Sequence, residues 1–176
     1  MLAPGVLASE CTALGLINEA NHHVSDEAKD KIVQIRSEKS ADTLAPNTWT
    51  IVYYDTSVRG RKTEVKFVDG AKSEVGHPFR LFARKETSEN VLDRSKLKMD
   101  SDQALKIAQK DGLLDKLKLS HSRMTLEKQE ETPVWKITFW AGKTHEPESA
   151  VEIGDIFVNA ENGKIVRRDL HLQRVE

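Results

Sequence analysis

The sequence predicts an α+β protein made of two similar units, each a helix packed on a three- to four-stranded antiparallel sheet. Three observations lead to this fold class. A tryptophan-containing strand pattern occurs twice, a helical pattern precedes each copy, and an Asp–Gly or Asn–Gly turn follows each copy. A repeat of this kind is weighed first, because missing it leads to the wrong fold.

Each unit is expected to begin with a helix. Residues 10–17 and 101–108 both carry apolar residues at helical spacing. Ser9 precedes the first segment, and Asp100 or Ser101 precedes the second. Side chains of these types accept hydrogen bonds from the free N–H groups at the start of a helix, so they are candidate N-caps.

The strongest strand predictions are the two tryptophan segments, 48–54 and 134–140. Both alternate β-branched and aromatic residues with a period of two, which is typical of a strand. When they are aligned, Trp49 matches Trp135 and Tyr54 matches Trp140. The side chains expected to face the helices and form the core are Trp49, Ile51, Tyr53, Trp135, Ile137 and Phe139.

Further strands are expected on both sides of each tryptophan segment. Those before it are 31–37 and 118–128, although the first of these also fits a helix. Those after it are 65–68 and 155–159, which end in turns at Asp69-Gly70 and Asn162-Gly163. Such residues suit tight turns through positive φ angles or side-chain hydrogen bonds. A last strand is expected at 73–75, with an extension to 82 left open, in one unit and at 164–172 in the other.

The alignment divides the chain into two repeats. Residues 1–86 form the N-terminal unit, residues 87–99 are a polar connection, and residues 100–176 form the C-terminal unit.

The residues that carry the repeat resemble the PepSY family. They are Ser-Asp-Gln-Ala-Leu-Lys-Ile-Ala at 101–108, Pro-Val-Trp-Lys-Ile-Thr-Phe at 133–139 and Ile-Phe-Val-Asn-Ala-Glu-Asn-Gly-Lys-Ile-Val at 156–166. The N-terminal half resembles a degenerate second copy. The resemblance implies small α+β modules located outside the cytoplasm, a role in restraining or inhibiting peptidases, and no catalytic residues to carry over.

Composition excludes several classes of protein. The 176 residues include 27 Lys and Arg, 28 Asp and Glu and one cysteine, for a net charge of -1. Balanced charge gives no global reason to bind nucleic acid, and one cysteine cannot form an intrachain disulfide. No apolar stretch approaches the ~18 residues of a membrane span. Residues 1–8 are apolar but lack the preceding positive charge of a signal peptide, so the sequence leaves the compartment open. The oligomeric state is also left open by the sequence.

No motif indicates catalysis, a metal or a cofactor, so an enzyme is not expected. His145-Glu146 is followed by Pro147, which interrupts any zinc-binding helix. Cys11 and His22 are too far apart on one helix to act together, since eleven residues span about 16 Å. The basic run at 59–62 is interpreted as a solvated hairpin loop.

The strongest functional prediction concerns Tyr54 and Trp140, which share the strand parity opposite the core. An exposed aromatic platform there would bind a protein or an extended peptide, including a peptidase. The alternative is that both rings are internal, because the two units pack together. A non-enzymatic binding module is therefore the leading hypothesis. A structural subunit of a larger complex and a small-ligand carrier are the alternatives.

Overall fold

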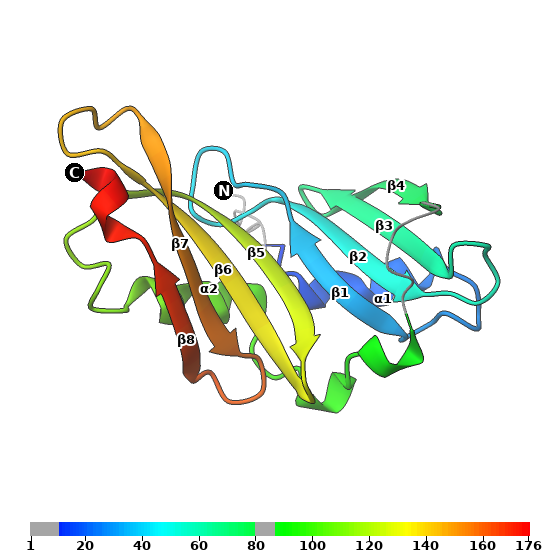
Figure 1. The fold of residues 1–176 in the computed structure, drawn as a ribbon. Coiled ribbons are helices and arrows are strands. Elements are labelled where there is room, and N and C mark those ends of the chain that lie inside the picture. Colours follow the sequence, from blue (N-terminus) through cyan, green and yellow to red (C-terminus); the bar gives the residue numbers. More distant parts are fainter. Residues whose placement is uncertain (1–10, 80–86) are drawn as a thin grey trace, which may run out of the picture.

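The computed structural model describes residues 11–79 and 87–176. Its main feature is one antiparallel sheet of eight strands, in the order β4-β3-β2-β1-β5-β6-β7-β8 (Figure 1). The strands are β1 (Ile32–Ser37), β2 (Thr48–Tyr54), β3 (Lys62–Val68), β4 (Ala71–Gly76), β5 (Leu119–Gln129), β6 (Thr132–Gly142), β7 (Ala150–Asn159) and β8 (Ile165–Leu170).

The predicted fold class, two similar units that each pack a helix on a three- to four-stranded sheet, is wrong. β1 pairs with β5, with Ile35 opposite Leu126, so that all eight strands form one continuous sheet. The physical reason is that β1 and β5 would otherwise each be an edge strand with unpaired main-chain groups, and their pairing satisfies those groups. Helical structure is also scarcer than expected, because α1 (Ile17–Asn21) and α2 (Ser101–Gln109) are short.

A single core lies between the sheet and the helices. The six side chains predicted to face inward are confirmed, since each is at most 1% exposed. Trp49 and Trp135 meet in this core, with ring centroids 6.2 Å apart and an interplanar angle of 75°. This edge-to-face arrangement is one of the favoured geometries for aromatic pairs. The two indoles therefore hold one core together instead of anchoring two.

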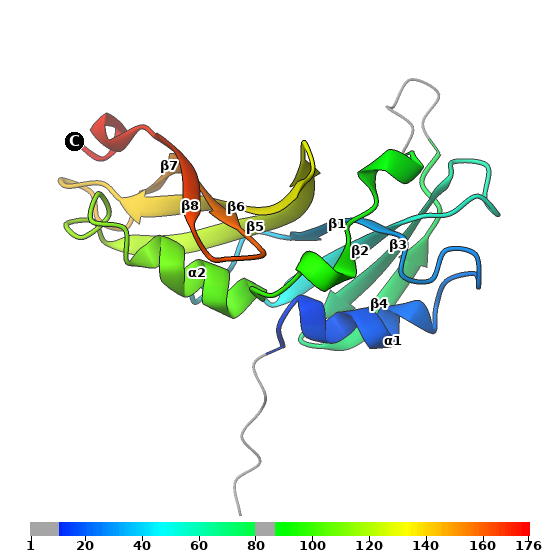
Figure 2. The ribbon, with the colours of Figure 1, turned by 90° about the horizontal axis from the view of Figure 1, so that it is seen from below.

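Both helices lie on the same side of the sheet (Figure 2). α2 begins as predicted, with Asp100 and Gln103 forming a reciprocal capping box. The N-terminal helical segment starts later than predicted, with a 3-10 turn at Leu14–Leu16 that continues into α1. Its predicted cap, Ser9, lies outside the described residues.

The strand predictions agree with the structure at most positions. Residues 31–37, which also fitted a helix, form β1. Asp69 and Gly70 both have positive φ, 49° and 81°, and close the hairpin between β3 and β4, which matches the turn chemistry expected of that pair. β4 ends at Gly76, and positions 80–82 of the predicted last strand lie outside the described residues.

The polar connection is packed against the sheet. It contains two 3-10 turns, Ser88–Asn90 and Arg94–Lys96. Between them Leu92 is 2% exposed, and its N–H donates to the carbonyl of Ile32 at 2.7 Å. The segment thus covers the start of β1 before it reaches α2.

Candidate binding surface on the open face of the sheet

The side of the sheet opposite the helices is called the open face here (upper side in Figure 2). It is formed by the strand positions that alternate with the core positions. In β6 these include Lys136, Thr138 and Trp140, while Trp135, Ile137 and Phe139 point into the core. The open face is therefore the surface on which a partner could contact the strands.

Most cations of the open face are paired with carboxylates. Arg36 and Lys62 contact Glu64 at 2.7 and 2.9 Å, and Lys136 contacts Asp155 at 3.1 Å. Burial raises the pKa of Glu64, but hydrogen bonds and charge from Lys62 and Arg36 outweigh burial, so the pKa is lowered overall. These charges are engaged within the chain and leave little to attract a partner.

Trp140 lies in a different environment. Its side chain is 9% exposed, because Lys39 and Arg123 lie over it. The Nζ of Lys39 is 4.8 Å from the ring centroid and the guanidinium carbon of Arg123 is 5.4 Å from it. Both distances fall within the usual range of a cation–π contact. Trp140 is thus a buried indole beneath two exposed cations.

Neither Lys39 nor Arg123 has an acidic partner within the described part of the chain. Glu152 stands directly across from Trp140 on β7, is exposed, and forms an ion pair with neither Lys39 nor Arg123. On the other side of Trp140, His121 is its cross-strand neighbour on β5, and its buried Nδ1 has no partner among the described residues. We call Lys39, His121, Arg123 and Trp140 the Trp140 cluster.

Local pairing explains why these residues meet. β5 and β6 place His121 opposite Trp140, and Arg123 opposite Thr138, on the same face. Lys39 comes from the segment after β1, where the N–H of Ser40 donates to the carbonyl of Ser122 at 2.8 Å. In return, the hydroxyl of Ser40 accepts from the N–H of Ser122 at 2.9 Å. This reciprocal contact fixes Lys39 beside β5.

Tyr54 does not belong to the cluster. It is half-buried at the end of β2, opposite Lys62, and its N–H donates to the carbonyl of Lys31 at 2.8 Å. β2 and β6 run in opposite directions, because each adjacent pair from β2 through β1 and β5 to β6 is antiparallel. The carboxyl-terminal ends of the two strands, where Tyr54 and Trp140 lie, are therefore at opposite ends of the sheet.

The basic run at 59–62 lies in the predicted hairpin loop between β2 and β3, except for Lys62, which begins β3. There Arg59 stacks on Phe79, 4.8 Å from its ring centroid. Arg167 and Arg168 belong to β8, at the far edge of the sheet. The structure therefore does not bring these basic groups together.

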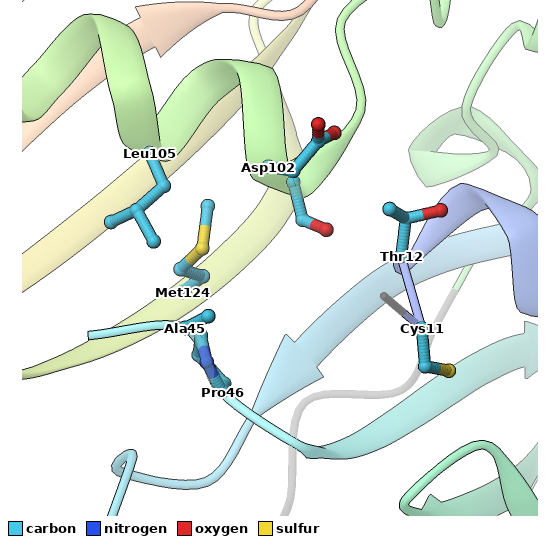
Figure 3. A pocket seen from close by; sticks show the side chains of 8 residues that line it. Cys11, Thr12, Ala45, Pro46, Asp102, Leu105 and Met124 are labelled. Atoms are coloured by element: carbon cyan, nitrogen blue, oxygen red, sulfur yellow. The ribbon is translucent and has the colours of Figure 1, made fainter. Parts of the chain in front are cut away.

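A small pocket lies between α2 and the start of the N-terminal helical segment (Figure 3). Leu105 and Met124 line one side of it, and Cys11 and Thr12 lie opposite. Its cavity volume of about 30 Å³ is far below the ~300–1,000 Å³ typical of small-molecule sites. Burial, followed by the charges of Asp100 and Asp69, raises the pKa of the Cys11 thiol, which disfavours the reactive thiolate.

Within residues 11–79 and 87–176, no three His, Cys, Asp or Glu side chains gather in a way that could hold a metal ion. His145 is exposed in the loop between β6 and β7. No helix of the described residues has the length and apolar character needed to cross a membrane.

Comparison of the chain with protein-family models, with curated proteins and with solved structures found no match. The resemblance to the PepSY family therefore stays a prediction from the sequence.

Proposed function

We propose that this protein is a non-catalytic binding module that holds an acidic segment of a partner polypeptide at the Trp140 cluster. The observation that carries the proposal is the pair of exposed cations, Lys39 and Arg123, that lie over one indole without a carboxylate partner among the described residues.

Charge complementarity favours an acidic ligand group. Both cations lie over the same ring, so their charged groups are no more than about 10 Å apart, close to the Debye length at physiological salt. A carboxylate between them would accept charge-assisted hydrogen bonds, each worth about 1.5–3 kcal/mol. The buried indole below positions both cations through its ring face.

A polypeptide partner fits better than a nucleic acid. A nucleic-acid site needs cations in a continuous patch, since affinity rises with the number of phosphates that are neutralised. Here Arg36 and Lys136 on the open face are already paired with Glu64 and Asp155, and Arg167 on β8 lies over the ring of Phe157. Two free cations suit one or two acidic side chains.

The direct test is titration of the purified protein with an oligoglutamate peptide, followed by calorimetry. We expect saturable binding that weakens as ionic strength rises. Lys39→Ala and Arg123→Ala should each weaken binding about tenfold, equivalent to about 1.4 kcal/mol. Lys136→Ala is the matched control. Lys136 is a cation on the same face and on the same strand as Trp140, but Asp155 already neutralises its charge.

Three results would refute the proposal. One is no binding of oligoglutamate at low salt. A second is an equal loss of affinity in the Lys136→Ala control, which would indicate a diffuse charge effect. A third is tighter binding of inorganic phosphate than of the peptide, which would assign the cluster to a small anion.

The resemblance to PepSY adds a second stage to this test. If the acidic segment belongs to a peptidase, a secreted metallopeptidase should lose activity when the protein is added, and Arg123→Ala should restore that activity. Unchanged peptidase activity together with normal oligoglutamate binding would retain the binding function and remove peptidase restraint.

A further inference from the structure

β8 is an edge strand with a free main-chain side. It is the last strand of the sheet and pairs only with β7 among the described residues. The N–H of His171 donates to the carbonyl of Ile153 on β7 at 2.7 Å. Since main-chain bonds alternate along an antiparallel strand, Asp169 also faces β7, whereas Arg168 and Leu170 direct their N–H and C=O groups away from the sheet.

This edge is not covered by another strand among the described residues. Natural edge strands limit association through short length, charged side chains, bulges, prolines or a covering segment, and β8 has three charged residues but no covering segment or proline. Residues 165–170 contain no proline, and Val166 is 52% exposed. The charge of Arg168 is already neutralised, because its Nε lies 2.6 Å from Oδ2 of the buried Asp111.

The sequence of β8 is complementary to itself. A second copy can be placed antiparallel with Arg168 opposite Arg168. A residue before position 168 in one copy then faces the residue equally far after position 168 in the other copy. Arg167, which lies over the ring of Phe157, is then opposite Asp169 twice. Val166 is opposite Leu170 twice if the strand is regular there, although Val166 is the extra residue at a register shift between β8 and β7. Opposite charges and apolar residues in directly facing positions both stabilise an antiparallel strand pair.

The geometry points to a symmetric dimer in which the β8 strands of two copies pair antiparallel about Arg168 and join the two sheets. The second copy is the occupant of this edge. The outward N–H of each Arg168 donates to the outward carbonyl of the other Arg168. The two Arg167–Asp169 pairs fix the register of the two strands. This association does not involve the Trp140 cluster and does not depend on the proposed function.

The test is sedimentation equilibrium of the full chain over a range of concentrations. The wild-type protein is expected to dimerise reversibly. Asp169→Arg should raise the dimer dissociation constant at least ~tenfold, because it places arginine opposite Arg167 of the other copy. Arg167→Asp should act similarly. The double variant Arg167→Asp/Asp169→Arg restores opposite charges in both facing positions and should dimerise again.

A second pair of variants tests the main-chain contact. Arg168→Pro removes the outward N–H and should give a monomer, whereas Arg168→Ala also loses the Asp111 ion pair but retains the N–H and should remain dimeric. A monomeric wild-type protein at every concentration overturns the inference. So does a dimer that Asp169→Arg and Arg168→Pro leave unchanged, or a double variant that fails to dimerise although its circular dichroism is native.

Discussion

The two halves of the sheet, β1–β4 and β5–β8, share an apolar pattern but differ in how their polar groups are satisfied. The indole N–H of Trp135 donates to the carbonyl of Met99 at 2.9 Å. The indole N–H of Trp49 and the hydroxyl of Tyr53 have no partner among the described residues. Where Tyr53 stands in one half, Phe139 stands in the other. Apolar alternation thus specifies the strands in both halves, while hydrogen bonding in the core is more complete in the C-terminal half.

The two helical segments also differ in how their free N–H groups are capped. α2 has its own capping box, whereas no side chain of the N-terminal segment caps it. Its free N–H groups are satisfied from the other half. Ala13 N–H donates to the hydroxyl of Ser101 at 3.0 Å, and Leu14 N–H donates to Oδ1 of Asp100 at 2.9 Å. The C-terminal half therefore supplies the caps for both helices, and the N-terminal half depends on it.

The largest expected difference between the halves lies at the two tryptophans. Both Trp→Phe changes leave space in the core, but Trp135→Phe also removes the partner of the Met99 carbonyl. Leaving a buried acceptor unpaired costs about 1–3 kcal/mol. Urea unfolding should show that Trp135→Phe lowers the unfolding free energy by this much more than Trp49→Phe does. Equal losses would mean that the Met99 contact contributes nothing.

Asp100 tests the dependence of one half on the other. Asp100→Ala removes the cap of α2 and the acceptor of Leu14 N–H, and loss of a cap alone costs about 0.5–2 kcal/mol. The matched control is Asp93→Ala, which removes the Ser95 N–H acceptor of an exposed 3-10 turn. Hydrogen exchange should accelerate at Leu14 as well as in α2 for Asp100→Ala, and at neither site for Asp93→Ala. Unchanged exchange at Leu14 would contradict capping between the halves.

The smallest effect at neutral pH is expected for Tyr53→Phe, which makes the N-terminal half resemble the C-terminal half. It removes a buried hydroxyl without a described partner, so the unfolding free energy should change by less than about 1 kcal/mol or rise.

Alkaline pH should enlarge this difference. Burial, followed by the charge of Asp30, raises the pKa of Tyr53, despite the opposing charge of Arg94. The unfolded chain releases this proton near pH 10 while the folded chain retains it, so wild-type stability falls as pH rises above about 10. Tyr53→Phe should lack this part of the decline in urea titrations. Identical pH profiles would place the Tyr53 hydroxyl in contact with solvent.

Local signals in the sequence predicted local structure well. Alternation located the two tryptophan strands and their buried parity, and the Asp69-Gly70 pair located a turn, because both patterns depend on neighbouring residues. The pairing of β1 with β5 was not predicted, since it joins Ile35 to Leu126 across 90 intervening positions. No periodicity within a segment reports which strand it will pair with.

The residues of the candidate site were likewise predicted only in part. Trp140 was identified from strand parity, but Lys39 was missed because it lies in an irregular segment and reaches the indole through the contact of Ser40 with Ser122. Arg123 sits on the expected face of a predicted strand, and pairing with β6 brings it to Trp140. Tyr54 was paired with Trp140 from the repeat alignment, which gives equivalent positions but not proximity.

The central structural claim, that the two halves share one sheet and one core, is tested most directly by proton NMR of the two indoles. With ring centroids 6.2 Å apart and edge-to-face geometry, nuclear Overhauser effects should connect ring protons of Trp49 with those of Trp135, and each Trp→Phe variant should abolish them. Strong effects from each indole to its own half, with none between the two rings, would contradict the account.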